Sequence, residues 1–285
     1  MDAMRGVASL GVVLFHAYSA AFGDEAGFAF FDKGPAAFFE EAPAAQAVLH
    51  PFVGFGYLGV ALFFVISGFC IHLPFAGGRK PMEPWPFAKR RFLRLYPVFL
   101  LVTVANFAWV LLGSTVSGQE NRALTGQNFL GHLLLWFYWV PDGVSTLGIN
   151  AAFWSIAIEA HFYVLFALFF SPLMRLGVGK CAGVLFAGGV AYYLWWYVSG
   201  ARETQPAFME PRYFSLARFG EWLIGAWLAE LYVRGHLRRF GKSLVAVLAS
   251  CAGGLTLIAG AMLIARRSSS SATSRPSPSP RSASR

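Results

Sequence analysis

Charged residues are scarce in this chain of 285 residues, where Asp, Glu, Lys and Arg together make up 13%. A soluble domain carries about a quarter charged residues, so the composition excludes an ordinary soluble protein. Acidic residues are scarcest, 14 against 23 Lys and Arg. The net charge of +9 does not indicate nucleic-acid binding, because the positive residues lie in short stretches between apolar segments, where they usually report topology.

Cysteine is also rare, and the sequence shows no internal repeat. The three cysteines, Cys70, Cys181 and Cys251, fall in different apolar segments and lack the spacing of a metal site or a disulfide framework. We interpret them as small buried hydrophobic residues. The sequence therefore predicts no metal site and no permanently bound cofactor.

Long apolar stretches dominate the chain, which is 56% hydrophobic with a mean hydropathy of +0.54. Seven stretches can cross a hydrocarbon core of about 30 Å. They are Met4 to Phe22, Phe52 to Phe75, Leu93 to Gly113, Ala152 to Phe170, Cys181 to Val198, Phe214 to Val233 and Leu244 to Ala265. An eighth, Phe129 to Val140, is short and typical of a re-entrant or interfacial segment. We predict an all-α fold, a polytopic transmembrane helix bundle with seven or eight apolar segments.

The loops differ in charge, which predicts the orientation in the lipid bilayer. The connection between the first two segments is acidic, whereas the next carries Arg79, Lys80, Lys89, Arg90, Arg91 and Arg94. The positive-inside rule places the second loop and the N-terminus in the cytoplasm. We expect the membrane to be a bacterial cytoplasmic (inner) membrane. If Phe129 to Val140 does not cross, which we favour, the cytoplasmic side also receives Arg175, Lys180, Arg234, Arg238, Arg239 and Lys242.

The composition changes abruptly after the last apolar segment. Residues 266–285 contain mainly Ser, Pro and Arg, with no apolar side chain larger than Ala. Such a segment cannot bury a core, so we predict a transmembrane domain over residues 1–265 and a disordered tail. The tail is either a genuine basic extension or the product of a reading-frame shift that shortened a longer membrane domain.

Two ionisable residues lie inside the first apolar segment. Arg5 and His16 are eleven positions apart, about three helical turns, so they share one helix face roughly 16 Å apart. An ionisable side chain at that depth indicates a functional site. His16 can take and return a proton near neutral pH, whereas Arg5 can hold an anion.

A pair of arginines begins the third segment. Arg91 and Arg94 are three residues apart, so their guanidiniums point to the same side of a helix and can bind phosphate. An isolated pair of this kind is more often a positive-inside anchor. The four basic residues beside it favour a large cytoplasmic anion.

Two other segments carry polar residues among apolar ones. Ser67, followed by Gly68, offers one hydroxyl where helices can approach closely, a pattern that more often indicates packing than chemistry. Glu159 lies within an apolar run and needs a partner or a watery cavity to remain charged. A structural salt bridge explains it as well as catalysis does, with candidate partners Arg5, Arg91, Arg94 and His16.

Further polar residues have simpler interpretations. We expect His161 to be a packing or interface residue, and Arg218 with Glu221 to form a local ion pair three residues apart. The remaining histidines fall near segment ends or in loops, and we assign no role to His50, His72, His132 and His236.

Taken in order, four motifs resemble the membrane-bound acyltransferase-3 family over roughly residues 1 to 235. They are Arg5-x10-His16 after Asp2, Phe63-Phe64-x-x-Ser67-Gly68, Arg91-x-x-Arg94-x-x-Pro97 and Trp154-Ser155-x-x-x-Glu159-x-x-Phe162-Tyr163. Members of that family move acyl groups, commonly acetyl, from cytoplasmic acyl-CoA to sugars of surface polysaccharides and related acceptors.

The resemblance implies a role for each motif. It makes His16 catalytic, as the general base on an acceptor hydroxyl, with Glu159 as a second catalytic residue. It places Arg5, Arg91 and Arg94 at the CoA end of the acyl-CoA donor. Substrate binding falls to the remaining motif residues, Ser67, Trp154, Ser155 and Tyr163. The acceptor it implies is a carbohydrate or glycolipid.

Two other functions stay open. A proton- or anion-coupled transporter would line a path with Arg5, His16 and Glu159, although the lack of paired broken helices or an inverted repeat disfavours it. A truncated, inactive family member would keep the front motifs and lose the far end of the bundle.

Overall fold

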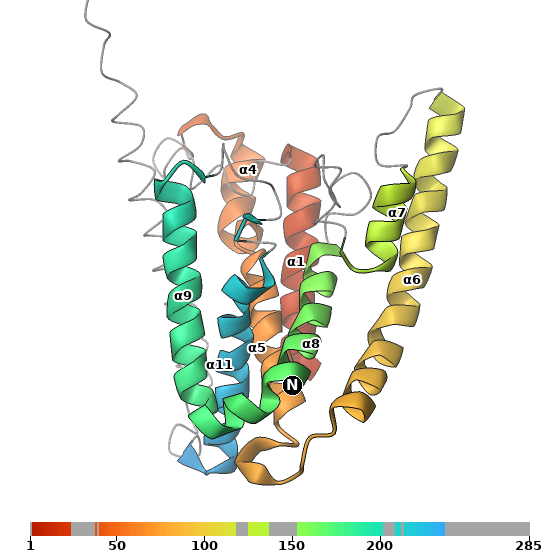
Figure 1. Cartoon of the computed structure of the whole chain (residues 1–285). Helices are drawn as coiled ribbons and strands as arrows, with labels where there is room; N and C mark the ends of the chain where they lie inside the picture. Colours follow the sequence, from red (N-terminus) through yellow and green to blue (C-terminus); the bar gives the residue numbers. More distant parts are fainter. Residues whose placement is uncertain are drawn as a thin grey trace, which may run out of the picture.

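The computed structural model describes residues 2–23, 38, 40–117, 125–136, 153–201, 209–211 and 214–236. Within these ranges every regular element is helical, which confirms the all-α prediction (Figure 1). The longer helices are α1 (Asp2–Phe22), α5 (Leu58–His72), α6 (Pro84–Ser117), α8 (Phe153–Leu176), α9 (Val178–Val198) and α11 (Ser215–Val233). The shorter ones are α4 (Ala44–Leu49), η1 (His50–Gly54), η2 (Ala76–Gly78) and α7 (Gly126–Leu133).

Five helical stretches are long and apolar enough to cross a membrane: Met4–Phe22, Ala44–Gly78, Pro84–Gly113, Phe153–Leu176 and Val178–Val198. This supports an integral membrane protein, while the predicted count of seven or eight is not confirmed. The predicted segment Phe214 to Val233 forms α11, which carries three charged residues and is not among the five. Leu244 to Ala265 and the tail from 266 lie outside the described residues.

The short segment Phe129 to Val140 does not form a span as far as it is described. Helix α7 ends at Leu133, and its eight residues cover about 12 Å, less than half of a hydrocarbon core. Leu135, two residues later, has a positive φ of 58° that a helix cannot continue. Residues 137–140 lie outside the described part of the chain.

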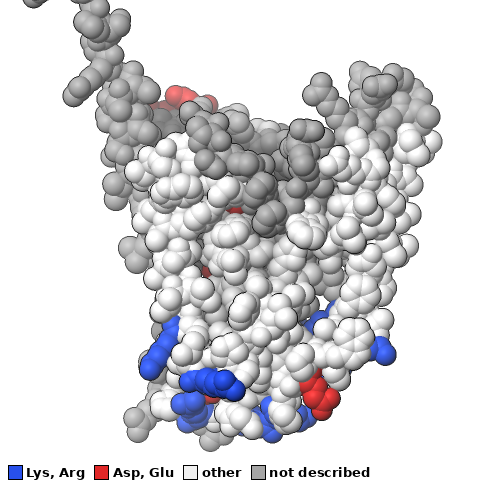
Figure 2. Space-filling model, in the orientation of Figure 1, with Lys and Arg blue, Asp and Glu red and all other residues white. Residues whose placement is uncertain are grey.

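The described basic segments lie at one end of the bundle. Helices α6 and α9 begin there, and α8 and α11 end there (Figure 1). Lys and Arg side chains gather at the same end in Figure 2. Lys180 and Arg234 therefore lie with the basic loop before α6, as expected for a short segment that does not cross. We call this the basic end.

Helix α11 is the centre of the bundle, packed between α5 and α9. Close approach depends on glycine: a Cβ at Gly68 of α5 would overlap the backbone oxygen of Trp222, and one at Gly189 of α9 would overlap that of Ala217. Small residues at helix interfaces allow such approach in membranes, where packing rather than hydrophobic burial drives association. The close contacts hold α11 against both neighbours and thereby fix the position of its polar side chains.

Large apolar side chains cover the outside of the bundle. Leu101, Leu168 and Val184 are each at least 70% exposed, in helices α6, α8 and α9. Exposed leucine and valine on long apolar helices are what lipid contact requires. The interior holds closely packed aromatic rings instead, including Phe166 and Trp222 with ring centroids 4.9 Å apart and planes tilted by 58°.

Candidate active site

A polar cluster lies between α5 and α8 in the interior of the bundle. The Ser67 hydroxyl donates a hydrogen bond of 2.7 Å to Glu159 Oε1, and the Tyr163 hydroxyl donates one of 2.6 Å to the same oxygen. Glu159 and Tyr163 are one helical turn apart, so both reach the same side of α8. The short distances are typical of hydroxyl groups that donate to an ionised carboxylate. Three residues from two separate motifs thus meet at one atom.

Trp222 of α11 extends this cluster to a third helix. Its indole nitrogen lies 3.4 Å from Ser67 Oγ, a long hydrogen bond in which Ser67 is the acceptor. Trp222 is completely buried and Ser67 is 3% exposed. The approach depends on Gly68, because a side chain there would collide with the Trp222 backbone. Gly68 therefore allows the two helices to pack closely, and Ser67 beside it contributes its hydroxyl to the cluster.

Arg91 joins the cluster from α6. Its guanidinium carbon lies 6.0 Å from the centre of the Tyr163 ring and 5.5 Å from that of Phe87, distances at which a cation interacts with an aromatic face. The Arg91 Nε is buried and has no hydrogen-bond partner within the described residues. Arg94, one turn further on, is exposed. The two arginines therefore have different surroundings, and only Arg91 faces Tyr163.

A second group of charged and aromatic side chains surrounds Trp154 at the start of α8. Arg218 lies over the Trp154 ring at 5.3 Å and over Phe64 at 5.0 Å. It forms a two-pronged ion pair with Glu221, of 2.8 Å and 3.2 Å, which confirms the predicted local pair. Ser155 follows Trp154 and is half-buried. Arg218 was not expected to touch a site residue, because nothing in the sequence links positions 64 residues apart.

The first-helix pair lies elsewhere on the bundle. His16 is exposed on α1, with its ring edge-on to Phe15 at 5.8 Å, and it forms no hydrogen bond or ion pair with the residues described. Arg5 is half-buried on the same helix. Helix α1 packs mainly against α5. The structure thus unites Ser67, Glu159 and Tyr163 but does not bring His16 into contact with them.

The sequence interpretation missed a buried pair near the basic end. His72 Nε2 lies 2.8 Å from Glu230 Oε1, and the backbone N–H of Gly77 donates to Glu230 Oε2 at 3.1 Å. A carboxylate inside an apolar segment was the available signal for Glu230. Its partner is 158 residues away, which a single sequence does not reveal. His161 bonds Ser215 Oγ at 2.7 Å across α8 and α11, as expected of a packing residue.

Comparisons with known proteins identify the family of this chain. Residues 1–274 match a family model described as "Acyltransferase domain". The chain is 26% identical to "Acyltransferase MdmB" of Streptomyces mycarofaciens across 54% of this chain and 35% of that protein. It is 32% identical to "Putative peptidoglycan O-acetyltransferase YrhL" of Bacillus subtilis across 40% of this chain and 19% of that protein. The chain therefore spans well under half the length of these relatives, and no solved structure matches it.

Proposed function

Because this chain belongs to the acyltransferase-3 family, we propose that it is an integral-membrane O-acyltransferase, moving an acyl group from acyl-CoA to a hydroxyl of a carbohydrate or glycolipid. Acetyl is the acyl group we expect. The name of the Bacillus relative supports a carbohydrate polymer as acceptor. We place the basic end and the N-terminus in the cytoplasm of a bacterial cell, where acyl-CoA is made, by the positive-inside rule.

One observation carries this proposal: Glu159 accepts hydrogen bonds from Ser67 and Tyr163, and the Tyr163 ring contacts Arg91 on α6, the helix that begins at the basic end. Tyr163 follows Glu159 by one turn in the direction in which α8 runs to that end, and Arg91 lies over the Tyr163 ring. Buried polar groups are costly among apolar helices and mark functional positions. A donor with an anionic end and a reactive end would match this order.

In the proposed reaction His16 removes the proton from the acceptor hydroxyl, and the resulting oxygen attacks the thioester carbonyl. The carbon–sulfur bond then breaks, and His16 returns the proton to the CoA thiolate. A positioned general base contributes about 10²- to 10⁴-fold to such a step. The products are an ester and free CoA thiol, so atoms and charge balance.

The other motif residues position the two substrates. Arg5, Arg91 and Arg94 bind the phosphate groups of the donor through guanidinium hydrogen bonds. Glu159 fixes the hydroxyls of Ser67 and Tyr163, and Trp154 with Ser155 contributes to the substrate-binding surface. Holding thioester and hydroxyl together lowers the barrier through orientation alone. Transport finds less support, because the sequence contains no paired broken helices and no inverted repeat.

The test uses the full chain expressed in a host lacking its own enzyme, with radiolabelled acetyl-CoA as donor and isolated cell-envelope glycan as acceptor. The His16→Ala variant should lose base-labile label while inserting normally in the membrane. Ser9→Ala changes an exposed polar residue on the same helix and serves as the control. Undiminished acylation by His16→Ala would remove His16 from the mechanism.

Donor binding is tested separately at the basic end. Replacing both Arg91 and Arg94 by Ala should raise the KM for acyl-CoA at least tenfold, because each lost charge-assisted phosphate bond costs about 1.5–3 kcal/mol. Arg90→Ala, an exposed neighbour, is the control. An unchanged KM in the double variant would contradict the assignment of these arginines.

A further inference from the structure

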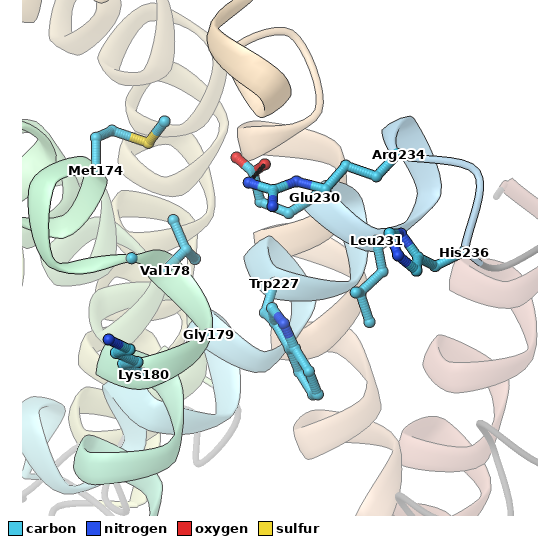
Figure 3. Close-up of a pocket in the computed structure, with 10 residues that line it drawn as sticks. Met174, Val178, Gly179, Lys180, Trp227, Glu230, Leu231, Arg234 and His236 are labelled. Carbon is cyan, nitrogen blue, oxygen red and sulfur yellow. Dashed lines mark hydrogen bonds and ion pairs between the residues drawn. The ribbon is translucent and has the colours of Figure 1, made fainter.

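A pocket of about 500 Å³ opens at the basic end, between the start of α9 and the end of α11 (Figure 3). None of the residues proposed for acyl transfer lines it. Met174, Val178 and Leu231 give it apolar walls, and the Trp227 indole borders it in Figure 3. A Cβ at Gly179 would crowd the Trp227 indole nitrogen, so the missing side chain leaves room for that ring.

Side-chain donor groups with few hydrogen bonds surround the pocket. The side chains of Lys180 and His236 form no hydrogen bond with the residues described, and neither does the Trp227 indole. Among the same residues the Arg234 side chain has a single hydrogen bond, of 3.4 Å from Nη2 to Glu230, and it is 63% exposed. The cavity is therefore bordered by two cationic side chains, an imidazole and an indole N–H. These groups can donate further hydrogen bonds to a bound acceptor.

The backbone at the start of α9 adds to this preference for an anion. The intrahelical bonds begin at Lys180 and Cys181, both to the Gly177 oxygen, so the N–H groups of Val178 and Gly179 remain available at the pocket wall. The first turn contains no acidic residue. The positive end of the helix dipole therefore acts in the same direction as the side chains.

Among the described residues, Glu230 is the one carboxylate in the wall, and it does not cancel this charge. Glu230 directs Oε1 to His72 and Oε2 to the Gly77 N–H, both on the side of α5. Its remaining contact holds Arg234 at the edge of the pocket. Glu230 thus holds the Arg234 side chain in position and leaves its other N–H groups able to bind an anion.

We infer that this pocket binds the phosphate of an anionic phospholipid headgroup. It lies where α8 and α11 end and α9 begins, the level at which headgroups meet a membrane protein. Basic pockets between helices and interfacial tryptophan are features of such sites. The acyl chains can follow the apolar outer face of α9, where Val184 is 72% exposed. A soluble donor, by contrast, gains nothing from that face.

The experiment measures lipid retention by native mass spectrometry on the full chain purified in a neutral detergent. Phosphatidylglycerol is the probe, and phosphatidylcholine is the zwitterionic comparison. In the double variant Lys180→Gln with Arg234→Gln we expect phosphatidylglycerol affinity to fall about tenfold or more. Arg175→Gln removes an exposed charge at the same end that does not line the pocket, and it should retain wild-type affinity.

Three results would overturn the inference. Equal losses in the Arg175 variant and in the double variant would mean that general surface charge attracts the lipid. Equal retention of the two lipids would mean that the phosphate charge is not recognised. Displacement of phosphatidylglycerol by soluble CoA or inorganic phosphate at equal concentration would assign the pocket to a free phosphate. If the double variant aggregates, Lys180→Gln alone is measured against Arg175→Gln with the same criteria.

Discussion

Replacing Tyr163 by phenylalanine removes one hydroxyl and leaves the ring beneath Arg91 in place. The lost bond is the 2.6 Å hydrogen bond to Glu159 Oε1, after which Ser67 is the one described residue that donates to that oxygen. Hydrogen bonds to charged groups contribute about 1.5–3 kcal/mol, which corresponds to roughly 10- to 150-fold in a rate or binding constant. We therefore expect kcat/KM for acyl-CoA to fall by at least tenfold while the protein remains folded.

The control is Tyr192→Phe on helix α9. It removes a hydroxyl that donates a hydrogen bond of 2.6 Å to the Met209 carbonyl. Both variants are measured in proteoliposomes with labelled acetyl-CoA, and their thermal unfolding is followed in detergent. Tyr192→Phe should change stability only. The reasoning fails if Tyr163→Phe retains activity within twofold of wild type, or if the two variants lose activity equally.

Two predictions concern the packing that holds the site. Gly189→Ala should lower the unfolding temperature in detergent, because the added methyl overlaps the backbone of α11 and overpacking costs about 1–3 kcal/mol. Gly188→Ala is the control: its methyl meets open space and should stabilise the helix by up to about 1 kcal/mol. Equal shifts would refute the close contact. Glu221→Gln should lower the unfolding temperature strongly, because it leaves the buried Arg218 charge without its ion-pair partner. Arg218→Met combined with Glu221→Leu should recover much of the lost stability in the same assay.

The helical framework could be predicted from sequence because lipid imposes a simple rule. Long apolar runs must be helical, so most boundaries agree with the structure to within a few residues, as for Met4 to Phe22 against α1. The largest difference is instructive. Predicted to start at Leu93, the third segment forms a helix from Pro84, because its basic first turns continue the helix beyond the apolar part. Hydropathy marks the hydrocarbon core and not the helix ends.

Parts of the candidate site were recognisable, but their association was not. Ser67 and Glu159 stand out as polar residues in apolar runs, yet they are 92 positions apart, and only the fold shows that they share a hydrogen bond. Trp222 gave no signal at all, because a tryptophan in an apolar segment is ordinary. It reaches Ser67 through a contact that depends on Gly68, and shape complementarity of that kind is not encoded in residue type.

The separation between His16 and the arginines leads to a further expectation about kinetics. A donor whose phosphates remain near Arg5 must extend about 16 Å along α1 to present its acyl carbon to His16. CoA has such an arm between its phosphates and its thioester. The Tyr163 ring adjoins Arg91, so in the proposed reaction the cluster of Glu159 and Tyr163 places the donor, whereas His16 transfers the proton. Tyr163→Phe should therefore raise the KM for acyl-CoA more than it lowers kcat, and His16→Gln should lower kcat with little change in KM. If Tyr163→Phe instead lowers kcat alone, the Glu159 cluster acts on the chemical step.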